Sequence, residues 1–221
     1  WSATGMSAWQ KAHKWGDNPD TSEVNAQPGL FNLTRSNKDL KIATTMRVFI
    51  PNTHDKVELI IIEVENQDTK AKTLDVTYSI PLFGRHADNF RDHRQVTTMF
   101  QRVFKESHGV RIKANIVHDE HGHSPNHTSY LALGTDADGN GPEHIWLKMN
   151  DFIGEGGSLD NPEAVFKHLN APIYHYGEAD GTEAIGAFRF AKTTIQGHSK
   201  ARFIIIQGIS EDDEIAKKWV E

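Results

Sequence analysis

A dense group of polar side chains follows directly after a predicted β-strand. Apolar and polar residues alternate from Leu74 to Ile80, as in a half-buried strand, and Pro81 is predicted to end its pairing. The next segment supplies guanidinium, imidazole, carboxylate and amide groups within ten residues: Arg85, His86, Asp88, Asn89, Arg91, Asp92, His93 and Arg94. Guanidiniums bind phosphate or carboxylate through paired hydrogen bonds, and Asp and Asn beside them suit sugar hydroxyls. Because loops mounted on rigid strands often carry function, this segment is the first candidate binding site; a self-paired, solvated surface loop is the alternative.

A second polar cluster lies further along the chain. It contains side chains that could ligate a metal ion or line a binding rim: His118, Asp119, Glu120, His121 and His123. On a strand, His121 and His123 would project the same way, and an acid could complete a site. The spacing matches no established zinc pattern, so we favour a polar loop with solvated histidines and expect no metal.

The chain lacks the residues that several classes of enzyme reaction require. The chain has no cysteine, which excludes disulfides, thiolate metal sites and a cysteine nucleophile. No G-x-S-x-G elbow supports a serine hydrolase, and Gly154–Gly157 lacks the lysine of a phosphate-binding P-loop. A pair of catalytic carboxylates could be proposed among the 30 acidic residues, but the sequence does not show which of them are close together.

The overall composition is typical of an acidic globular protein. The 221 residues carry a formal net charge of -6 without a basic stripe, so we expect no nucleic-acid partner and no membrane partner. No apolar run approaches the ~20 residues of a membrane helix. The first residues have neither an initiator Met nor the layout of a signal peptide. We therefore expect a cytoplasmic protein and a chain that is a fragment of something longer.

Alternating patterns predict several further strands. Leu40–Ile50 alternates strictly and Val57–Val64 is apolar and β-branched, and with Thr73–Ile80 they predict an antiparallel meander. Later strands are predicted at Val96–Phe104, Val110–Ile116, Ser129–Leu133, Ile145–Met149, Ala187–Phe190 and Arg202–Ile209. The glycine- and acid-rich segment Gly134–Pro142 is interpreted as a hairpin connection, because a calcium loop would need Glu where Leu147 stands.

Two short helices complete the predicted elements. Asn161–Leu169 begins with an Asn cap and a first-turn Pro, and Ser210 opens a terminal helix with a capping box. Trp1–Pro28 has no clean period, which predicts extended or looping structure. Short strands with two small helices predict a mainly β fold, a large sandwich of antiparallel sheets.

Several ordered motifs resemble those of a known enzyme family. Trp1–Thr4 resembles its "WSPT" signature, and Val48–Pro51 and Val57–Asn66 follow as "VFIP" and "VELIIIEVEN". Further on, Gly154–Val165 resembles its "FxGxxGSxxNPxAV" element, and Phe203–Ile209 resembles a closing strand. In this order, over nearly the whole chain, the motifs resemble the cellobiose, cellodextrin and related β-glucan phosphorylases (glycoside hydrolase family 94, formerly glycosyltransferase family 36).

The resemblance implies a fold and an activity. In that family this region is the N-terminal β-supersandwich, similar to galactose mutarotase, and an (α/α)6 barrel with the catalytic Asp follows a helical linker. The activity would be that of an inverting glycoside phosphorylase, a glycosyltransferase that transfers a hexosyl group from a β-glucan oligosaccharide or disaccharide to inorganic phosphate. Residues 1–209 would be the supersandwich and residues 210–221 the start of the linker. We then expect no catalytic residue in this segment and no cofactor, with phosphate as co-substrate.

The resemblance also implies where substrate is bound. These enzymes are homodimers in which a sandwich-domain loop reaches over the active site of the partner subunit, and residues 86–97 are our candidate for that loop. The expected rim residues are, in order of preference, Arg91, Asp92, His93 and Arg94, then Arg85, His86 and Asn89, with His118, Asp119 and Glu120 on a neighbouring loop. Asn89–Arg94 matches the "TNFQR"-like stretch of the cellobiose enzymes only loosely, which favours a related oligoglucan phosphorylase.

Two other functions stay open. A stand-alone carbohydrate-binding module of mutarotase-like fold would use tryptophans as stacking platforms: Trp1, Trp9 and Trp15. A mutarotase activity would use His86 and His175 with Glu178 as acid and base, although no local motif supports it. The predicted terminal helix favours the phosphorylase, because a module should end in a finished strand or linker.

Overall fold

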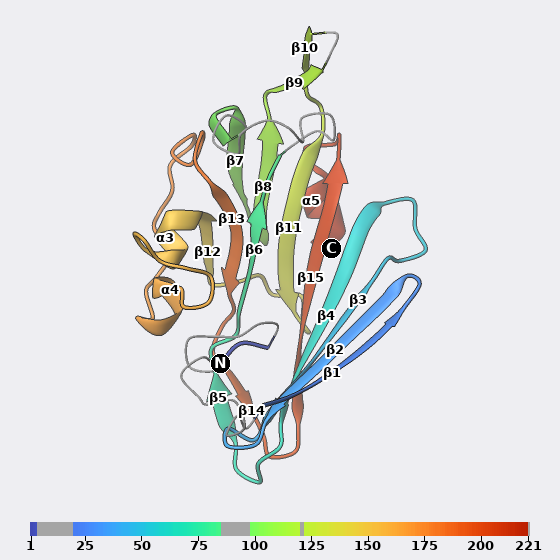
Figure 1. Ribbon diagram of the computed structural model, residues 1–221, viewed down its shortest axis with the longest axis vertical. Helices are drawn as coiled ribbons and strands as arrows, with labels where there is room; N and C mark the ends of the chain where they lie inside the picture. Colours follow the sequence, from blue (N-terminus) through green and yellow to red (C-terminus); the bar gives the residue numbers. More distant parts are fainter. Residues whose placement is uncertain (4–19, 85–97, 120–121, 221) are drawn as a thin grey trace.

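The fold is built around one large antiparallel sheet. The computed structural model describes residues 1–3, 20–84, 98–119 and 122–220 of the chain. Eight strands pair in the order β1-β2-β3-β4-β15-β11-β8-β7 (Figure 1). In that order their bounds are Asp20–Gln27, Leu30–Asn37, Ile42–Phe49, Lys56–Asn66, Lys200–Ser210, Ser129–Asp136, Gly109–Ala114 and Gln101–Glu106. The first four strands form a meander, whereas β15 enters from much later in the chain, between β4 and β11.

A smaller sheet packs against one face of the large sheet. It consists of β12 (His144–Lys148), β13 (Ala184–Arg189) and β6 (Thr77–Leu82), with β13 in the centre. Two ribbons lie at opposite ends of the molecule in Figure 1, one at the top and one at the bottom. They are β9 (Ile116–Asp119) with β10 (Gly122–Pro125), and β5 (Lys72–Leu74) with β14 (Thr193–Ile195). The packed antiparallel sheets confirm the predicted mainly β sandwich.

The main core lies between the two sheets. Phe188 of β13 and Phe190, just after it, share one apolar cluster with Phe203 and Ile205 of β15. The Phe190 and Phe203 rings are 4.8 Å apart, and none of the four side chains is more than 2% exposed. Burial of each such side chain is worth about 1.5–3 kcal/mol, so this cluster is a main reason why the layers stay together.

Three short helices in the described ranges cover the outer faces of the two sheets. α3 (Met149–Ile153) and α4 (Glu163–Phe166) pack on the outer face of the small sheet. α5 (Ile215–Val220) packs on the outer face of the large sheet, where a Cβ added to Gly208 would lie 2.7 Å from the Trp219 ring. No helix in the described ranges is long and apolar enough to cross a membrane.

Most predicted strands are confirmed, with shifts of a few residues at their ends. Leu40–Ile50 corresponds to β3, Val57–Val64 to β4, Val110–Ile116 to β8 and Arg202–Ile209 to β15. These segments alternate in sequence or are continuously apolar, and both patterns depend only on local side-chain direction.

The predicted three-strand meander is wrong. Thr73–Ile80 contains β5 and β6, which belong to different sheets, and β4 pairs with β3 and β15 instead. The meander begins earlier, because β1 lies in the segment interpreted as extended or looping and pairs with β2, which the sequence pattern does not predict. Pro28 and Gly29 form the connecting turn, and the φ of 77° at Gly29 fits the third position of a type II turn.

Pro81 does not end the pairing of its strand. It lies inside β6 and is the register partner of Ile185 in β13. Because β6 is an edge strand of the small sheet, the side of Pro81 that lacks an N–H can face away from the ladder.

The segment Gly134–Pro142 does not close a hairpin. Its first three residues end β11, and β12 follows it in a different sheet, so the segment crosses from one layer to the other. The Asp136 carboxylate accepts hydrogen bonds from the backbone N–H groups of Asp138 and Asn140, each at 2.9 Å. These bonds stabilise the turn.

Both predicted helices are shorter than the sequence pattern indicates. α4 covers only part of Asn161–Leu169, and its N-cap residue, Pro162, provides no side-chain cap. α5 begins at Ile215 rather than at Ser210, because Ser210 Oγ accepts the N–H of Asp212 in a turn that precedes the helix. α3, directly after β12, is not predicted.

Close packing of Gly186 against the large sheet predicts the effect of one added methyl group. A Cβ on Gly186 of β13 would lie 2.9 Å from the Cβ of Ala132 in β11. Gly186→Ala should therefore lower the free energy of unfolding by about 1–3 kcal/mol, as overpacking does. Adding Ala132→Gly should recover part of the loss. Urea unfolding of both single variants and the double variant measures this, and strictly additive effects would contradict the contact.

The buried Tyr78 phenol predicts a loss of stability in alkaline solution. Burial raises the pKa of Tyr78 to about 12, and the side-chain amide of Gln207 in β15 donates to its hydroxyl. An unfolded tyrosine ionises near pH ~10, so the unfolded chain releases this proton first, and stability is lost as the pH rises from about 10 to 12. Tyr78→Phe should flatten the alkaline part of the plot of unfolding free energy against pH. An unchanged slope would show that this phenol is not the group responsible.

Candidate functional site

Most of the predicted binding residues lie outside the described part of the chain. These are Arg85, His86, Asn89, Arg91, Asp92, His93, Arg94 and Glu120. The backbones of His118 and Asp119 belong to β9, where they pair with His123 and Gly122 of β10. The structure therefore describes the residues on either side of the predicted loop, and not the loop itself.

Gln101 connects the two sides of the predicted loop. Gly84, the last described residue before that loop, donates its N–H to Gln101 Oε1 over 3.4 Å, and Gln101 itself begins β7 after the loop. Gln101 Nε2 donates to the carbonyl oxygen of Thr182 at 2.9 Å. Since the side chain is only 2% exposed, a buried amide joins three segments that are distant in sequence.

The β9–β10 hairpin leaves the large sheet next to this connection. Asn115 follows the end of β8, and its N–H donates to the carbonyl oxygen of Phe100 at 2.8 Å. After β10, the side-chain amide of Asn126 donates to the carbonyl oxygens of Ala114 and Thr128 at 2.9 and 2.8 Å. The base of the hairpin is thus tied both to β8 and to the residues just before β7.

The hairpin and the predicted loop share one end of the sandwich. A Cβ on Gly84 would lie 3.3 Å from the backbone nitrogen of Ala114, at the base of the hairpin, which stands at the top of Figure 1. This arrangement brings the backbones of His118 and Asp119 to the end of the sandwich where the loop is anchored. In the described ranges no three His, Asp or Glu side chains are placed to hold a metal ion.

A third segment covers the outer edge of β7 at this end. Asp180 Oδ1 accepts the N–H of Val103 at 2.9 Å, and the N–H of Gly181 donates to the carbonyl oxygen of Gln101 at 3.0 Å. Tyr176 in the same segment is 85% exposed, with its ring centroid 6.4 Å from that of Phe104. An exposed aromatic face can stack on a sugar ring, and the sequence pattern alone does not distinguish this tyrosine.

The geometry disfavours His175 and Glu178 as an acid–base pair. Glu178 Oε2 accepts the backbone N–H of His175 at 3.0 Å, and Glu178 Oε1 lies 3.8 Å from Lys148 Nζ. The hydrogen bond from the His175 N–H is the largest cause that lowers the pKa of Glu178, and the nearby Lys148 charge lowers it further. A carboxylate with a lowered pKa is a weak general base, so Glu178 stabilises its loop.

Trp1 is a packing residue and not a stacking platform. Its Nε1–H donates to Asp20 Oδ1 at 2.9 Å, and the same oxygen accepts from Asn37 Nδ2 at 2.7 Å. The Trp1 side chain packs against the main core. Trp9 and Trp15 lie outside the described residues, so this structure does not place the other two predicted platforms.

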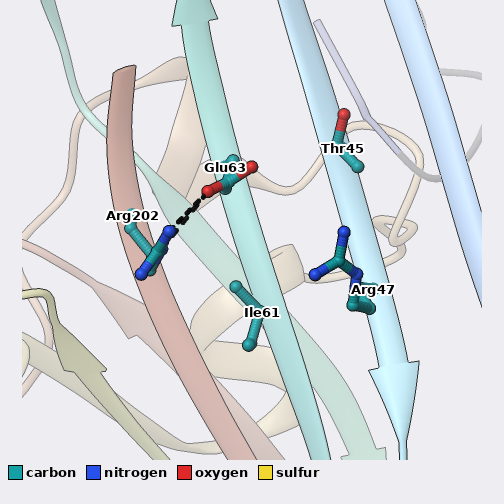
Figure 2. A pocket seen from close by; sticks show the side chains of 5 residues that line it. All are labelled: Thr45, Arg47, Ile61, Glu63 and Arg202. Carbon is teal, nitrogen blue, oxygen red and sulfur yellow. Dashed lines mark hydrogen bonds and ion pairs between the residues drawn. The ribbon is translucent and has the colours of Figure 1, made fainter.

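A shallow polar hollow lies on the outer face of the large sheet. Figure 2 shows the side chains from β3, β4 and β15 that line its volume of about 140 Å³: Thr45, Arg47, Ile61, Glu63 and Arg202. Arg202 donates to Glu63 Oε1 from Nη2 at 2.8 Å and from Nε at 3.3 Å. This pairing is the largest cause that lowers the pKa of Glu63. Because the carboxylate is already held by a guanidinium, the hollow is a charged surface and not a centre for proton transfer.

The sequence does not predict this hollow. Alternation places each lining residue on one face of its strand, but only strand pairing brings β3, β4 and β15 together.

Comparison with known proteins gives one family match. The whole chain, residues 1–221, matches the family described as glycosyl hydrolase 94, supersandwich domain. No curated protein matches the sequence. Similar solved structures include a polysaccharide lyase, a protein described as a kojibiose phosphorylase from the human microbiome, and a heparinase III.

The similarity to these structures is confined to a part of each. Their sequence identities are 8%, 8% and 12%, and their TM-scores are 0.48, 0.40 and 0.33, in that order. The matches cover 90%, 86% and 87% of this chain. The chain spans only 24%, 20% and 21% of those chains.

The position of Gln101 predicts that its side chain stabilises this end of the sandwich. Gln101→Leu should lower the free energy of unfolding by about 1–3 kcal/mol, because the Gly84 N–H and the Thr182 carbonyl lose a buried partner. Arg102→Ala is the matched control, because Arg102 is exposed and among the described residues its side chain donates to Asn115 at 3.0 Å. Urea unfolding compares the two variants, and equal losses would contradict a specific role for the amide.

Proposed function

The chain belongs to the glycosyl hydrolase 94 supersandwich-domain family, and on this premise we propose that it is the N-terminal sandwich domain of an inverting glycoside phosphorylase. The family match over all residues carries the proposal. The substrate is a β-glucan oligosaccharide or disaccharide, inorganic phosphate is the co-substrate, and no cofactor takes part. Residues 1–209 form the sandwich, and residues 210–221 begin the linker to an (α/α)6 catalytic barrel. The enzyme works in the cytoplasm.

The proposed reaction needs an acid and a positioned phosphate. A carboxylic acid of the barrel protonates the oxygen of the glycosidic bond as that bond breaks, and a phosphate oxygen attacks the anomeric carbon from the opposite face. The sugar 1-phosphate forms with inverted configuration, and the shortened glucan keeps the proton. Glu63 is held by Arg202 and Glu178 by a backbone N–H, so neither of these two acids is proposed as the proton donor.

The proposed contribution of the sandwich is a rim at the substrate site. In a homodimer the loop of residues 86–97 reaches the active site of the partner subunit. The contacts of the rim come from Arg91, Asp92, His93 and Arg94, then from Arg85, His86 and Asn89, with His118, Asp119 and Glu120 beside them. The shared anchoring of Gly84 and the β9–β10 hairpin at one end of the sandwich supports a common rim.

Phosphorolysis by the full product of the gene tests the proposal. With inorganic phosphate and β-glucan oligosaccharides or disaccharides, it should release a sugar 1-phosphate, whereas residues 1–221 alone should release none. Arg91→Ala and Arg94→Ala should each raise the KM for phosphate or acceptor sugar by roughly tenfold, as the loss of one charge-assisted hydrogen bond does.

Arg102→Ala is again the matched control, because Arg102 belongs to β7 and should leave the KM unchanged. Release of free sugar without phosphate consumption, or of nothing from any linkage tested, would contradict the phosphorylase. Normal kinetics in both loop variants would contradict the rim and leave the activity itself supported.

A further inference from the structure

An exposed aromatic side chain lies beside the anchor of the predicted loop. Tyr176 is 85% exposed and belongs to the segment between α4 and β13, which lies beside β7 in Figure 1. In that segment the N–H of Gly181 donates to the carbonyl oxygen of Gln101, and the carbonyl oxygen of Thr182 accepts from the Gln101 side chain. Since Gln101 also binds Gly84, this segment and the predicted loop are fixed at the same end of the sandwich.

The segment is fixed to the sandwich on both sides of Tyr176. Before it, the Tyr174 hydroxyl donates to Asp151 of α3 at 2.9 Å. After it, Ala179 is only 1% exposed and belongs to the main core, and Asp180 Oδ1 accepts an N–H of β7 at 2.9 Å. The backbone on either side is therefore held in place, so a ligand that binds the ring has little chain entropy to remove.

A tight turn places Tyr176 at its tip. The N–H of Glu178 donates to the carbonyl oxygen of His175 at 3.1 Å, which makes Tyr176 and Gly177 the two central residues of the turn. The φ of 78° at Gly177 fits the third position of a type II turn. Glu178 Oε2 accepts the N–H of His175 at 3.0 Å and closes the turn a second time. The ring is thus presented to solvent by a well-bonded backbone.

A second aromatic ring supports that of Tyr176. The ring centroids of Tyr176 and Phe104 are 6.4 Å apart, and the two ring planes are tilted by 52°. The Phe104 ring is itself held by Arg111, whose guanidinium carbon lies 4.1 Å from the ring centroid. Arg111 donates to Glu106 at 2.8 Å and to Asp213 at 3.1 Å. Phe104 therefore has a fixed position and still leaves most of the Tyr176 side chain exposed.

We propose that Tyr176 is a stacking platform for one glucose ring of the β-glucan substrate, an inference that rests on the proposed function for the class of ligand. In a β-linked glucan the hydroxyls of each ring are equatorial, so both ring faces are C–H surfaces that fit a flat aromatic side chain. The exposed neighbours His175 and Glu178 offer hydrogen-bonding groups to the hydroxyls at the edge of the sugar.

Size and charge favour a neutral sugar as the ligand. The residues next to Tyr176 in the turn are exposed and not apolar: His175, Gly177 and Glu178. One ring is far smaller than the about 800 Å² that a protein partner buries on each side, but it matches one hexose. The net charge of -6 and the nearby Glu178 carboxylate disfavour a chain that carries phosphates.

Saturation-transfer NMR on the 221-residue chain tests the platform, because this method detects weak sugar binding. A β-1,4-linked glucose tetramer should bind, and Tyr176→Ala should weaken the affinity by about two- to tenfold. Tyr176→Phe keeps the ring and should retain most of the affinity. An α-1,4-linked tetramer is curved and should bind more weakly.

Ile173→Ala is the matched control, because Ile173 belongs to the same segment and is 86% exposed but has no ring. It should leave the affinity unchanged. Wild-type chain that does not bind the β-linked tetramer, or Tyr176→Ala that binds it as the wild type does, would overturn the inference. Equal losses in both alanine variants, or equal binding of both tetramers, would overturn it as well. Since Tyr176 and Ile173 are both exposed, both variants should fold, which circular dichroism checks.

Kinetics of the full gene product test whether the bound sugar is the substrate. With the β-glucan oligosaccharide that it cleaves, Tyr176→Ala should raise the KM for that sugar by about two- to tenfold. The kcat and the KM for phosphate should stay unchanged, because stacking is equally strong before and during bond cleavage. A raised KM for phosphate, or no change in the KM for the sugar, would overturn the role of Tyr176 in substrate binding.

The outcomes separate this inference from the proposed function. Phosphorolysis that Tyr176→Ala does not change would overturn the platform and leave the phosphorylase supported. Sugar binding that is lost in Tyr176→Ala, in a protein whose full gene product consumes no phosphate, would support the platform and contradict the phosphorylase.

Discussion

The large sheet depends on the insertion of β15 between β4 and β11. Glu63 of β4 and Arg202 of β15 are register partners although they are 139 residues apart in the chain. Without β15 the sheet would be two separate pieces, a meander of β1 to β4 and a group formed by β11, β8 and β7. The same strand serves both faces, since Phe203 and Ile205 belong to the main core and Ile206 packs with α5.

Side-chain amides hydrogen-bond the backbone groups at the ends of several strands. Gln101 bridges Gly84 and Thr182, and Asn126 bridges both ends of the β9–β10 hairpin. At the opposite end of the sandwich, the fully buried Asn66 donates to the carbonyl oxygens of Lys70 and Ile195. Backbone groups that leave a ladder still need partners when they are buried, and an amide can serve two segments at once. This explains how a sandwich with long connections keeps its loops at fixed positions.

Strands could be predicted from the sequence, but their partners could not. The alternation of Leu40–Ile50 and the apolar run of Arg202–Ile209 reflect side-chain direction, which is local. The pairing of β4 with β15 and the division of Thr73–Ile80 between two sheets depend on contacts that no local pattern contains.

The candidate site, too, could be predicted only where its features are local in sequence. The polar density of residues 85–94 is visible in the sequence, and so is the resemblance to a family that the family match confirms. The contacts of Gln101 and the exposed position of Tyr176 beside Phe104 depend on neighbours that are distant in sequence, so sequence patterns do not find them.

The late position of β15 also has a consequence during synthesis on the ribosome. Chains grow at about 5–20 residues per second, so β4 is made roughly 7–27 seconds before its partner β15. During that interval the apolar strand edge of Leu59 to Ile62 is exposed in a chain that can already form its first hairpins. Nascent copies on one messenger RNA are close neighbours, and each displays the same unpaired strand. Slow pauses in translation after β4 would prolong this exposure, and chaperones that bind extended apolar segments would have a target there.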